Sequence, residues 1–121
     1  MHSARLLQYF QSSDHAGELP GANARVSLEN PICGDQLVLS AQIEGDRIVA
    51  ICFLARGCVA AMGTAAALCH LLQGRSVVEA RQLSRQQLID EVGGLSAASL
   101  HAAVLALDAR DQVLEKQAPG S

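Results

Sequence analysis

The sequence predicts an α+β fold, in which a three-stranded antiparallel sheet carries helices packed on one face. Apolar residues alternate over the ranges 25–29 and 36–43, which is the period of half-buried strands. Residues 48–54 are rich in β-branched and aromatic side chains, which favours a returning strand. Just after Gly57 the period changes to the three-and-four spacing of a buried helix that begins at residue 59. Three antiparallel strands in chain order are the simplest arrangement of these segments.

Size and composition indicate one folded domain over residues 1–121, with an ordered core at about 3–117. The chain is 50% hydrophobic and carries a net charge of −3, so it can fold without disulfides. Aromatic residues are scarce, at 2%, and the basic residues are scattered. Nucleic-acid binding, which relies on stacking platforms and basic stripes, is therefore not expected.

Residues 49–72 are mostly apolar and long enough to cross a bilayer. However, Arg56 lies within them, and an arginine at mid-bilayer costs at least ~2.5 kcal/mol. The period of the apolar residues also changes beside Arg56. We therefore expect two separate elements rather than one membrane-spanning helix, and no membrane partner. Residues 1–13 lack the continuous apolar run of a secretory signal, so we expect a cytoplasmic protein with reduced thiols.

In the sequence, helices are expected both before and after the three strands. Their ranges are 3–12, 59–73, 84–91 and 96 to about 117, with a shorter helical turn within 76–83. Ser84 to Gln87 matches a capping box. In the first helix Leu6, Leu7 and Phe10 should share one buried face. In the last helix the expected buried positions are Leu100, Val104, Leu107, Val113 and Leu114.

Cys33 and Asp35 lie two residues apart at the start of the second strand. In an extended backbone such residues point to the same side, so a thiol and a carboxylate would share one face. Gly34 between them allows the backbone to bend. A simple turn, in which Asp35 accepts a local hydrogen bond and Cys33 has no role, is an equally good interpretation of this short motif.

Cys58 follows the third strand and directly precedes a helix. A thiol at a helix N-terminus is favoured as thiolate, the form that binds metal. In a hairpin of 36–43 and 48–54, the start of one strand lies beside the end of the other. We therefore expect Cys33, Asp35 and Cys58 to converge, which outweighs the alternative that Cys58 is merely buried.

The other two cysteines lie too far along the chain to join such a site. Cys52 is up to ~20 Å from Cys58 along a strand, and Cys69 is ~16 Å further along a helix. Both are expected to pack in the core. His70 should lie on the surface, and His101, taken alone, is more typical of a partly buried helical histidine than of a metal ligand.

Four motifs resemble the NifU/IscU/SufU family of iron–sulfur cluster scaffold proteins. They are His15-Ala-Gly-Glu-Leu19, Asn30-Pro-Ile-Cys-Gly-Asp35, Gly57-Cys58 before an alanine-rich helix, and Leu100-His101. The resemblance covers about residues 5–115 and implies a three-stranded antiparallel sheet with helices on one face. It also implies a non-enzymatic scaffold that carries iron or a [2Fe–2S] cluster. A cysteine desulfurase would be its partner, and apo-proteins would accept the cluster.

The resemblance implies four ligands for metal or cluster, namely Cys33, Asp35, Cys58 and His101, with His101 as the partner of Asp35. The family's third cysteine would fall at position 102, where this chain has Ala102. Residues 95–99 also lack the Pro-Pro-Val-Lys element that the IscU branch shows to its chaperone, which argues against that kind of chaperone recognition. The remaining donor set could hold zinc or a mixed-ligand [2Fe–2S] cluster.

Three other functions compete with the scaffold. The chain could be a zinc-binding sulfur acceptor or regulator of a cysteine desulfurase, or a degenerate family member that binds a partner without metal. A Cys–His hydrolase would need Cys58 and His101 in contact with Asp35 as the orienting group. It is disfavoured because no oxyanion hole or substrate pocket is visible. The sequence leaves the oligomeric state open.

Overall fold

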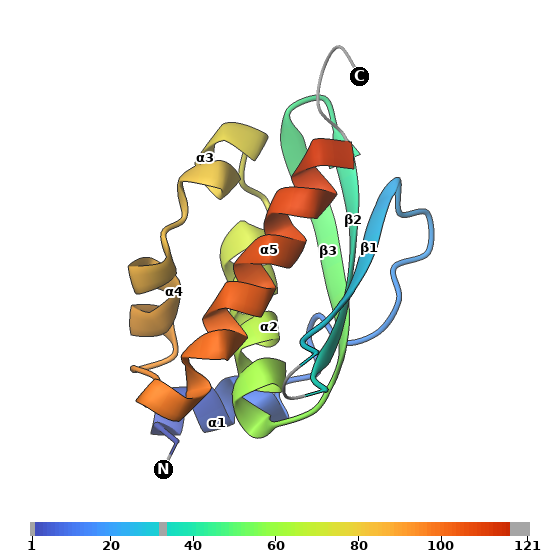
Figure 1. Ribbon diagram of the computed structural model, residues 1–121. Coiled ribbons are helices and arrows are strands. Elements are labelled where there is room, and N and C mark those ends of the chain that lie inside the picture. Colours follow the sequence, from blue (N-terminus) through green and yellow to red (C-terminus); the bar gives the residue numbers. More distant parts are fainter. Residues whose placement is uncertain (1, 32–33, 117–121) are drawn as a thin grey trace.

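The computed structural model describes residues 2–31 and 34–116, and its centre is a three-stranded antiparallel sheet (Figure 1). The strands are β1 (Ala24–Glu29), β2 (Gln36–Glu44) and β3 (Arg47–Arg56), in the order β1-β2-β3. Each begins and ends within two residues of its predicted range, and the predicted sheet is confirmed. The turn between β2 and β3 contains Gly45, whose φ is +63°, a value that glycine adopts without strain.

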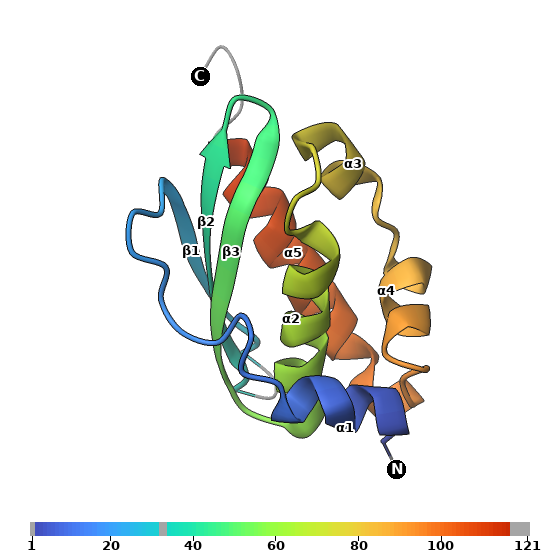
Figure 2. The same cartoon turned by 180° about the vertical axis from the view of Figure 1, so that it is seen from behind.

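The helices lie on one face of the sheet, as predicted (Figures 1 and 2). They are α1 (Ala4–Gln11), α2 (Val59–Leu72), α3 (Val77–Gln82), α4 (Arg85–Glu91) and α5 (Leu100–Lys116), with a 3₁₀ turn η1 (Ala97–Ser99) before α5. Helices α2 and α5 pack on the sheet, α3 and α4 form an outer layer, and α1 crosses one end of α2. The predicted capping box is present, because the side chains and backbones of Ser84 and Gln87 exchange hydrogen bonds.

The core lies between the sheet and the inner helices. The alternating residues of β2 (Leu37, Leu39, Ala41 and Ile43) all point into it and are buried, as the pattern predicted. Alanines on α2 let the helix approach the sheet closely. Gly63 plays the same part at the crossing with α1, because a Cβ there would lie 2.6 Å from Leu6 Cδ1.

The predicted buried faces of two helices are wrong in part. On α1, Leu6 is buried, but Leu7 and Phe10 are 40% and 37% exposed. On α5, Leu100 and Val104 are also exposed, whereas a row of small residues faces α2 and the sheet. Its buried members include Ala102, Ala103, Ala106 and Ala109. Val113 and Leu114 are buried, as predicted. Close packing between helices selects small side chains at the contact, so the large apolar residues marked only part of the buried face.

Residues 49–72 form two elements, most of β3 and all of α2, as the position of Arg56 predicted. Within the described parts of the chain, no helix combines the length and apolarity that a membrane span requires.

The outer edge of β3 is covered by residues 15–17 and, nearer the β2–β3 turn, by residues 74–75. The N–H of Phe53 donates to the carbonyl of His15, and the N–H of Gly17 donates to the carbonyl of Phe53, both at 2.8 Å. Nearer the turn, Ile48 exchanges backbone hydrogen bonds with Gly74 and Arg75. These contacts satisfy backbone groups that an edge strand leaves open and hold the strand that leads to the candidate site.

Candidate metal centre

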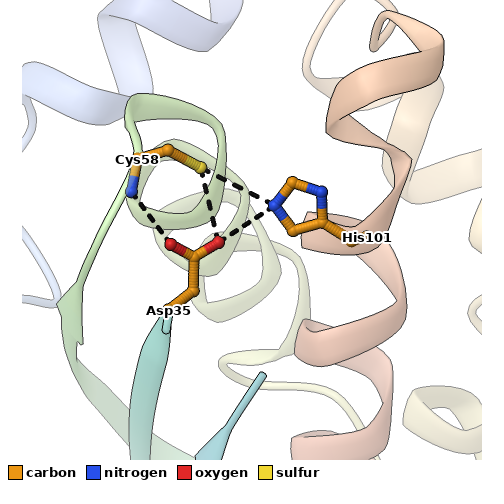
Figure 3. A group of neighbouring side chains, drawn as sticks. All are labelled: Asp35, Cys58 and His101. Atoms are coloured by element: carbon orange, nitrogen blue, oxygen red, sulfur yellow. Dashed lines mark hydrogen bonds and ion pairs between the residues drawn. The ribbon is translucent and has the colours of Figure 1, made fainter. Parts of the chain in front are cut away.

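Three segments far apart in the sequence meet at one end of the sheet. Asp35 precedes β2, Cys58 follows β3, and His101 lies in the first turn of α5 (Figure 3). Gln36 pairs with Arg56 at the ends of their strands, so the residues just beyond them are neighbours, as the hairpin predicted. One donor atom from each of the three side chains lies within 4.8 Å of the others.

The carboxylate of Asp35 is the centre of this group and is only 3% exposed. Its Oδ1 accepts the backbone N–H of Cys58 at 3.1 Å. Its Oδ2 lies 2.9 Å from His101 Nε2 and 3.5 Å from Cys58 Sγ (Figure 3). The two carboxylate oxygens therefore differ in role, because one anchors the side chain to the backbone and the other faces the two further donors.

The imidazole of His101 is oriented by the turn that precedes it. Its Nδ1 lies 3.0 Å from the carbonyl oxygen of Ala98 in η1, so Nδ1 carries the proton of that hydrogen bond. This leaves Nε2 directed at Asp35 and at Cys58 Sγ, which lies 3.8 Å away. Histidine ligands of metals are commonly fixed in this way by a carbonyl on the other ring nitrogen.

Cys58 is the N-cap residue of α2, and its Sγ accepts the N–H of Ala61 at 3.4 Å. The residue as a whole is exposed, but its sulfur is partly shielded beside Asp35. That shielding raises the pKa of the thiol, and the Asp35 carboxylate raises it further, whereas the N–H groups of Ala60 and Ala61 lower it. The N–H groups at the helix N-terminus therefore favour the thiolate, as expected, but burial and Asp35 outweigh them in the protein alone. A bound cation would reverse the balance, because coordination favours thiolate.

The remaining cysteines divide differently from the prediction. Cys69 is buried, as expected, and burial raises the pKa of its thiol well above the usual range. Cys52 is only half-buried, so its assignment to the core is wrong. It alternates along β3 with the buried Ile51 and Phe53 and so points to the opposite face of the sheet. Cys33 lies outside the described residues, and its predicted role as a ligand stays a prediction.

Two features of the site were not found from the sequence. The carbonyl of Ala98 orients His101, but a backbone contact leaves no signal in side-chain identity. Gly57 entered only as part of a motif, although its φ of +139° and its contact with Asp35 belong to the site. His70 is exposed, as predicted, and its ring also lies against that of Tyr9, with centroids 5.8 Å apart.

The donor set suits a metal of the zinc and iron type. It offers one sulfur, one imidazole nitrogen and one carboxylate oxygen, which are the ligands of such ions. Ligand bonds of ~2.0–2.3 Å in a tetrahedron place donor atoms ~3.3–3.8 Å apart. The sulfur of Cys58 already lies at such distances from Asp35 and His101, and the Asp35–His101 hydrogen bond needs to open by less than one ångström. The residues therefore fit a metal ion with small movements.

The fold and this donor set define a small α+β protein with metal-ligand chemistry at one end of its sheet. The chain belongs to the NifU-like N terminal domain family, whose model matches residues 1–117. The resemblance drawn from its motifs is therefore confirmed.

Individual relatives agree with this assignment. The chain is 29% identical over 109 residues to the iron–sulfur cluster assembly scaffold protein IscU 1 of Archaeoglobus fulgidus, covering 90% of this chain and 71% of that protein. It is 33% identical over 116 residues to the bifunctional protein NifU/MnmA of Rubrobacter xylanophilus, covering 94% of this chain but 24% of that longer protein.

A solved structure shares the fold. It is a protein of Fervidobacterium islandicum assigned as an iron–sulfur cluster assembly scaffold for the SUF system, with a TM-score of 0.81 and 17% identity. The match covers 93% of this chain and 96% of that chain. The predicted architecture is therefore one that exists in a solved structure.

Proposed function

We propose that this protein is an iron–sulfur cluster assembly scaffold and carrier, which binds iron or a cluster and passes it to apo-proteins. The convergence of Asp35, Cys58 and His101 on one point carries the proposal. Family membership over residues 1–117 and relatives named as scaffold proteins support it. In this role the cluster is cargo, and the protein is a carrier rather than an enzyme.

The proposed ligands are Asp35, Cys58 and His101, together with Cys33, which the sequence places two residues before Asp35. This set could hold an iron ion, or a [2Fe–2S] cluster with mixed ligands. Sulfide would have to come from outside. A cysteine desulfurase would supply the sulfur as an enzyme-bound persulfide, and an external two-electron reductant would convert that sulfur to sulfide. We place the process in the cytoplasm, where free thiols stay reduced.

The exposure of the site supports transfer over permanent storage. Cys58 is exposed and His101 is 25% exposed, whereas Asp35 behind them is almost completely buried. An incoming donor or acceptor could therefore reach the thiol and the imidazole directly. With Ala102 in place of a third cysteine, thiolates are few, and we expect weak and reversible binding.

Anaerobic reconstitution with ferrous iron and sulfide tests the proposal, followed by iron and sulfide analysis, visible absorption and transfer to an apo-ferredoxin. The natural protein should gain iron, sulfide and a visible charge-transfer band, and Cys58→Ser should lose them. Cys52→Ser is the matched control, because it also removes a thiol, but one that is half-buried on β3 and outside the site. Zinc binding without retention of iron or sulfide would contradict the scaffold, and so would the absence of any metal.

A further inference from the structure

Gly57 lies in contact with the carboxylate of Asp35, closer than any other residue type would allow. A Cβ at position 57 would lie 2.0 Å from Asp35 Oδ1 and 2.8 Å from its Cγ. The φ of Gly57 is +139°, a value that residues with a side chain rarely adopt. Any substitution at this position must therefore displace the carboxylate, the backbone or both.

The position of that carboxylate decides the geometry of the site. With Oδ1 held by the Cys58 N–H, the observed orientation of the side chain brings Oδ2 to both His101 and Cys58. At 3% exposure, Asp35 has little access to water as a substitute partner. A displaced carboxylate would lose its anchor, and the site would lose the group that links its other two donors.

We infer that Gly57 is a positioning residue, which acts through Asp35 to hold the carboxylate between Cys58 and His101. The positioning can be tested on the protein alone. Its consequence for metal or cluster binding rests on the function proposed above. Outer partners of metal ligands commonly contribute about 10–100-fold to metal affinity, and we expect Gly57→Ala to cost an amount in this range.

The matched control is Gly17→Ala. Gly17 has a similar φ of +122°, but a Cβ there would meet nothing within 4 Å. Both substitutions therefore impose a similar backbone strain, and only Gly57→Ala meets a carboxylate. Asp35→Ala and the double variant Gly57→Ala with Asp35→Ala complete a double-mutant cycle. The remaining close contact in that background is the Asp35 Cα, at 3.1 Å, which a small shift can relieve.

The first measurement is NMR of the His101 ring nitrogens at one fixed pH, in protein stripped of metal. His101 is remote from residue 57 in the sequence, and its ring contacts both Asp35 and Cys58. Comparison with Asp35→Ala therefore separates an effect through the carboxylate from one through Cys58. We expect Gly57→Ala to move these signals toward those of Asp35→Ala, whereas Gly17→Ala leaves them unchanged. The double variant should resemble Asp35→Ala. Unchanged ring signals in folded Gly57→Ala would overturn the inference.

The second measurement is the affinity for Co²⁺, read from the thiolate-to-cobalt absorption band. Affinity should fall about 10–100-fold in Gly57→Ala, and adding Gly57→Ala to Asp35→Ala should change it by less than about twofold. Additive losses would show that Gly57 does not act through Asp35 and would overturn the inference. If the natural protein binds no Co²⁺, the proposed function fails, but the ring signals still decide the positioning role.

Discussion

Two carboxylates each tie together distant parts of this chain, and they differ in what their partners can release. Asp35 joins Cys58 and His101 at one end of the sheet. At the junction of α1 and α4, Glu91 Oε2 accepts the hydroxyl of Tyr9 and the guanidinium of Arg5, each at 2.6 Å. Arginine keeps its proton at any accessible pH, whereas a thiol and an imidazole can exchange theirs for a metal ion.

The electrostatics of the two clusters reflect this difference. The hydrogen bond from Tyr9 and the nearby Arg5 keep the pKa of Glu91 below its usual range, and burial together with Glu91 raises the pKa of Tyr9 to about 12. The Glu91 cluster, made of Glu91, Tyr9 and Arg5, therefore keeps its protonation and its hydrogen bonds around neutral pH. In the Asp35 cluster, burial and the Asp35 carboxylate likewise raise the pKa of the Cys58 thiol, but there a bound cation removes the cost. The first cluster fastens the fold, and the second is suited to binding.

The largest expected effect is on metal affinity, which should depend on the Asp35 cluster and not on the Glu91 cluster. Cys58→Ser should weaken Zn²⁺ or Co²⁺ binding roughly 100-fold, because a full set of ligands in structural zinc sites shares about 10–16 kcal/mol. Glu91→Gln should leave this affinity unchanged, because Glu91 makes no contact with the site. Competition titration against a metal chelator measures both. Equal losses in the two variants would break the distinction between the clusters.

A second prediction adds a thiol beside the Asp35 cluster. Ala102→Cys adds a thiol directly after His101, where the family resemblance expects one, and should slow cluster loss about tenfold, since clusters are usually held by thiolates. Ala103→Cys is the control, because both alanines are buried on α5 at 2% and 0% exposure and carry a similar packing cost. Decay of the visible absorption after reconstitution gives the rates. Identical decay in the two variants would show that position 102 does not reach the site.

The sequence predicted the parts of the fold that depend on neighbouring residues. The strand alternation and the Ser84 capping box are local signals, and both are confirmed. Asp35 and Cys58 could be brought together because the register of a hairpin follows from its turn.

Features that depend on packing between distant segments were harder to predict. The placement of His101 came only from the family resemblance, because the path of α5 across the other elements is not encoded in spacing. The exposed face of α5 was mistaken for the same reason. Arg110, a buried cation on α5, bonds the carbonyls of Ala80 and Leu83 at the end of α3, and no local pattern marks it as a core residue.

A third prediction concerns the Glu91 cluster. Glu91→Gln should reduce the free energy of unfolding by about 1 kcal/mol at pH 7, because a charge-assisted but partly exposed group is lost. The folded pKa of Glu91 is lowered, so its contribution is present above the unfolded pKa and is lost as the pH falls through the folded value. Urea unfolding at pH 7 and pH 3 measures this. The difference between the variant and the natural protein should be smaller at pH 3 than at pH 7, and a constant difference would contradict the assignment.

The smallest expected effect is that of Tyr9→Phe, about 0.5–1 kcal/mol at pH 7 for one hydrogen bond. Its pH dependence has the opposite sense to that of Glu91. The raised pKa of Tyr9, about 12, means that the stabilisation is complete below the unfolded value near 10 and declines as the pH rises toward 12. Tyr9 is the only tyrosine in the chain, so tyrosinate absorbance follows this residue alone. Its midpoint should lie well above 10 in the folded protein and drop to the ordinary value in urea, and Glu91→Gln should lower the folded midpoint. If the midpoint is ordinary in the folded protein, Tyr9 is not held by Glu91, and α1 would be held by the packing of Leu6 against Gly63 and by the ion pair of Arg5 with Glu91.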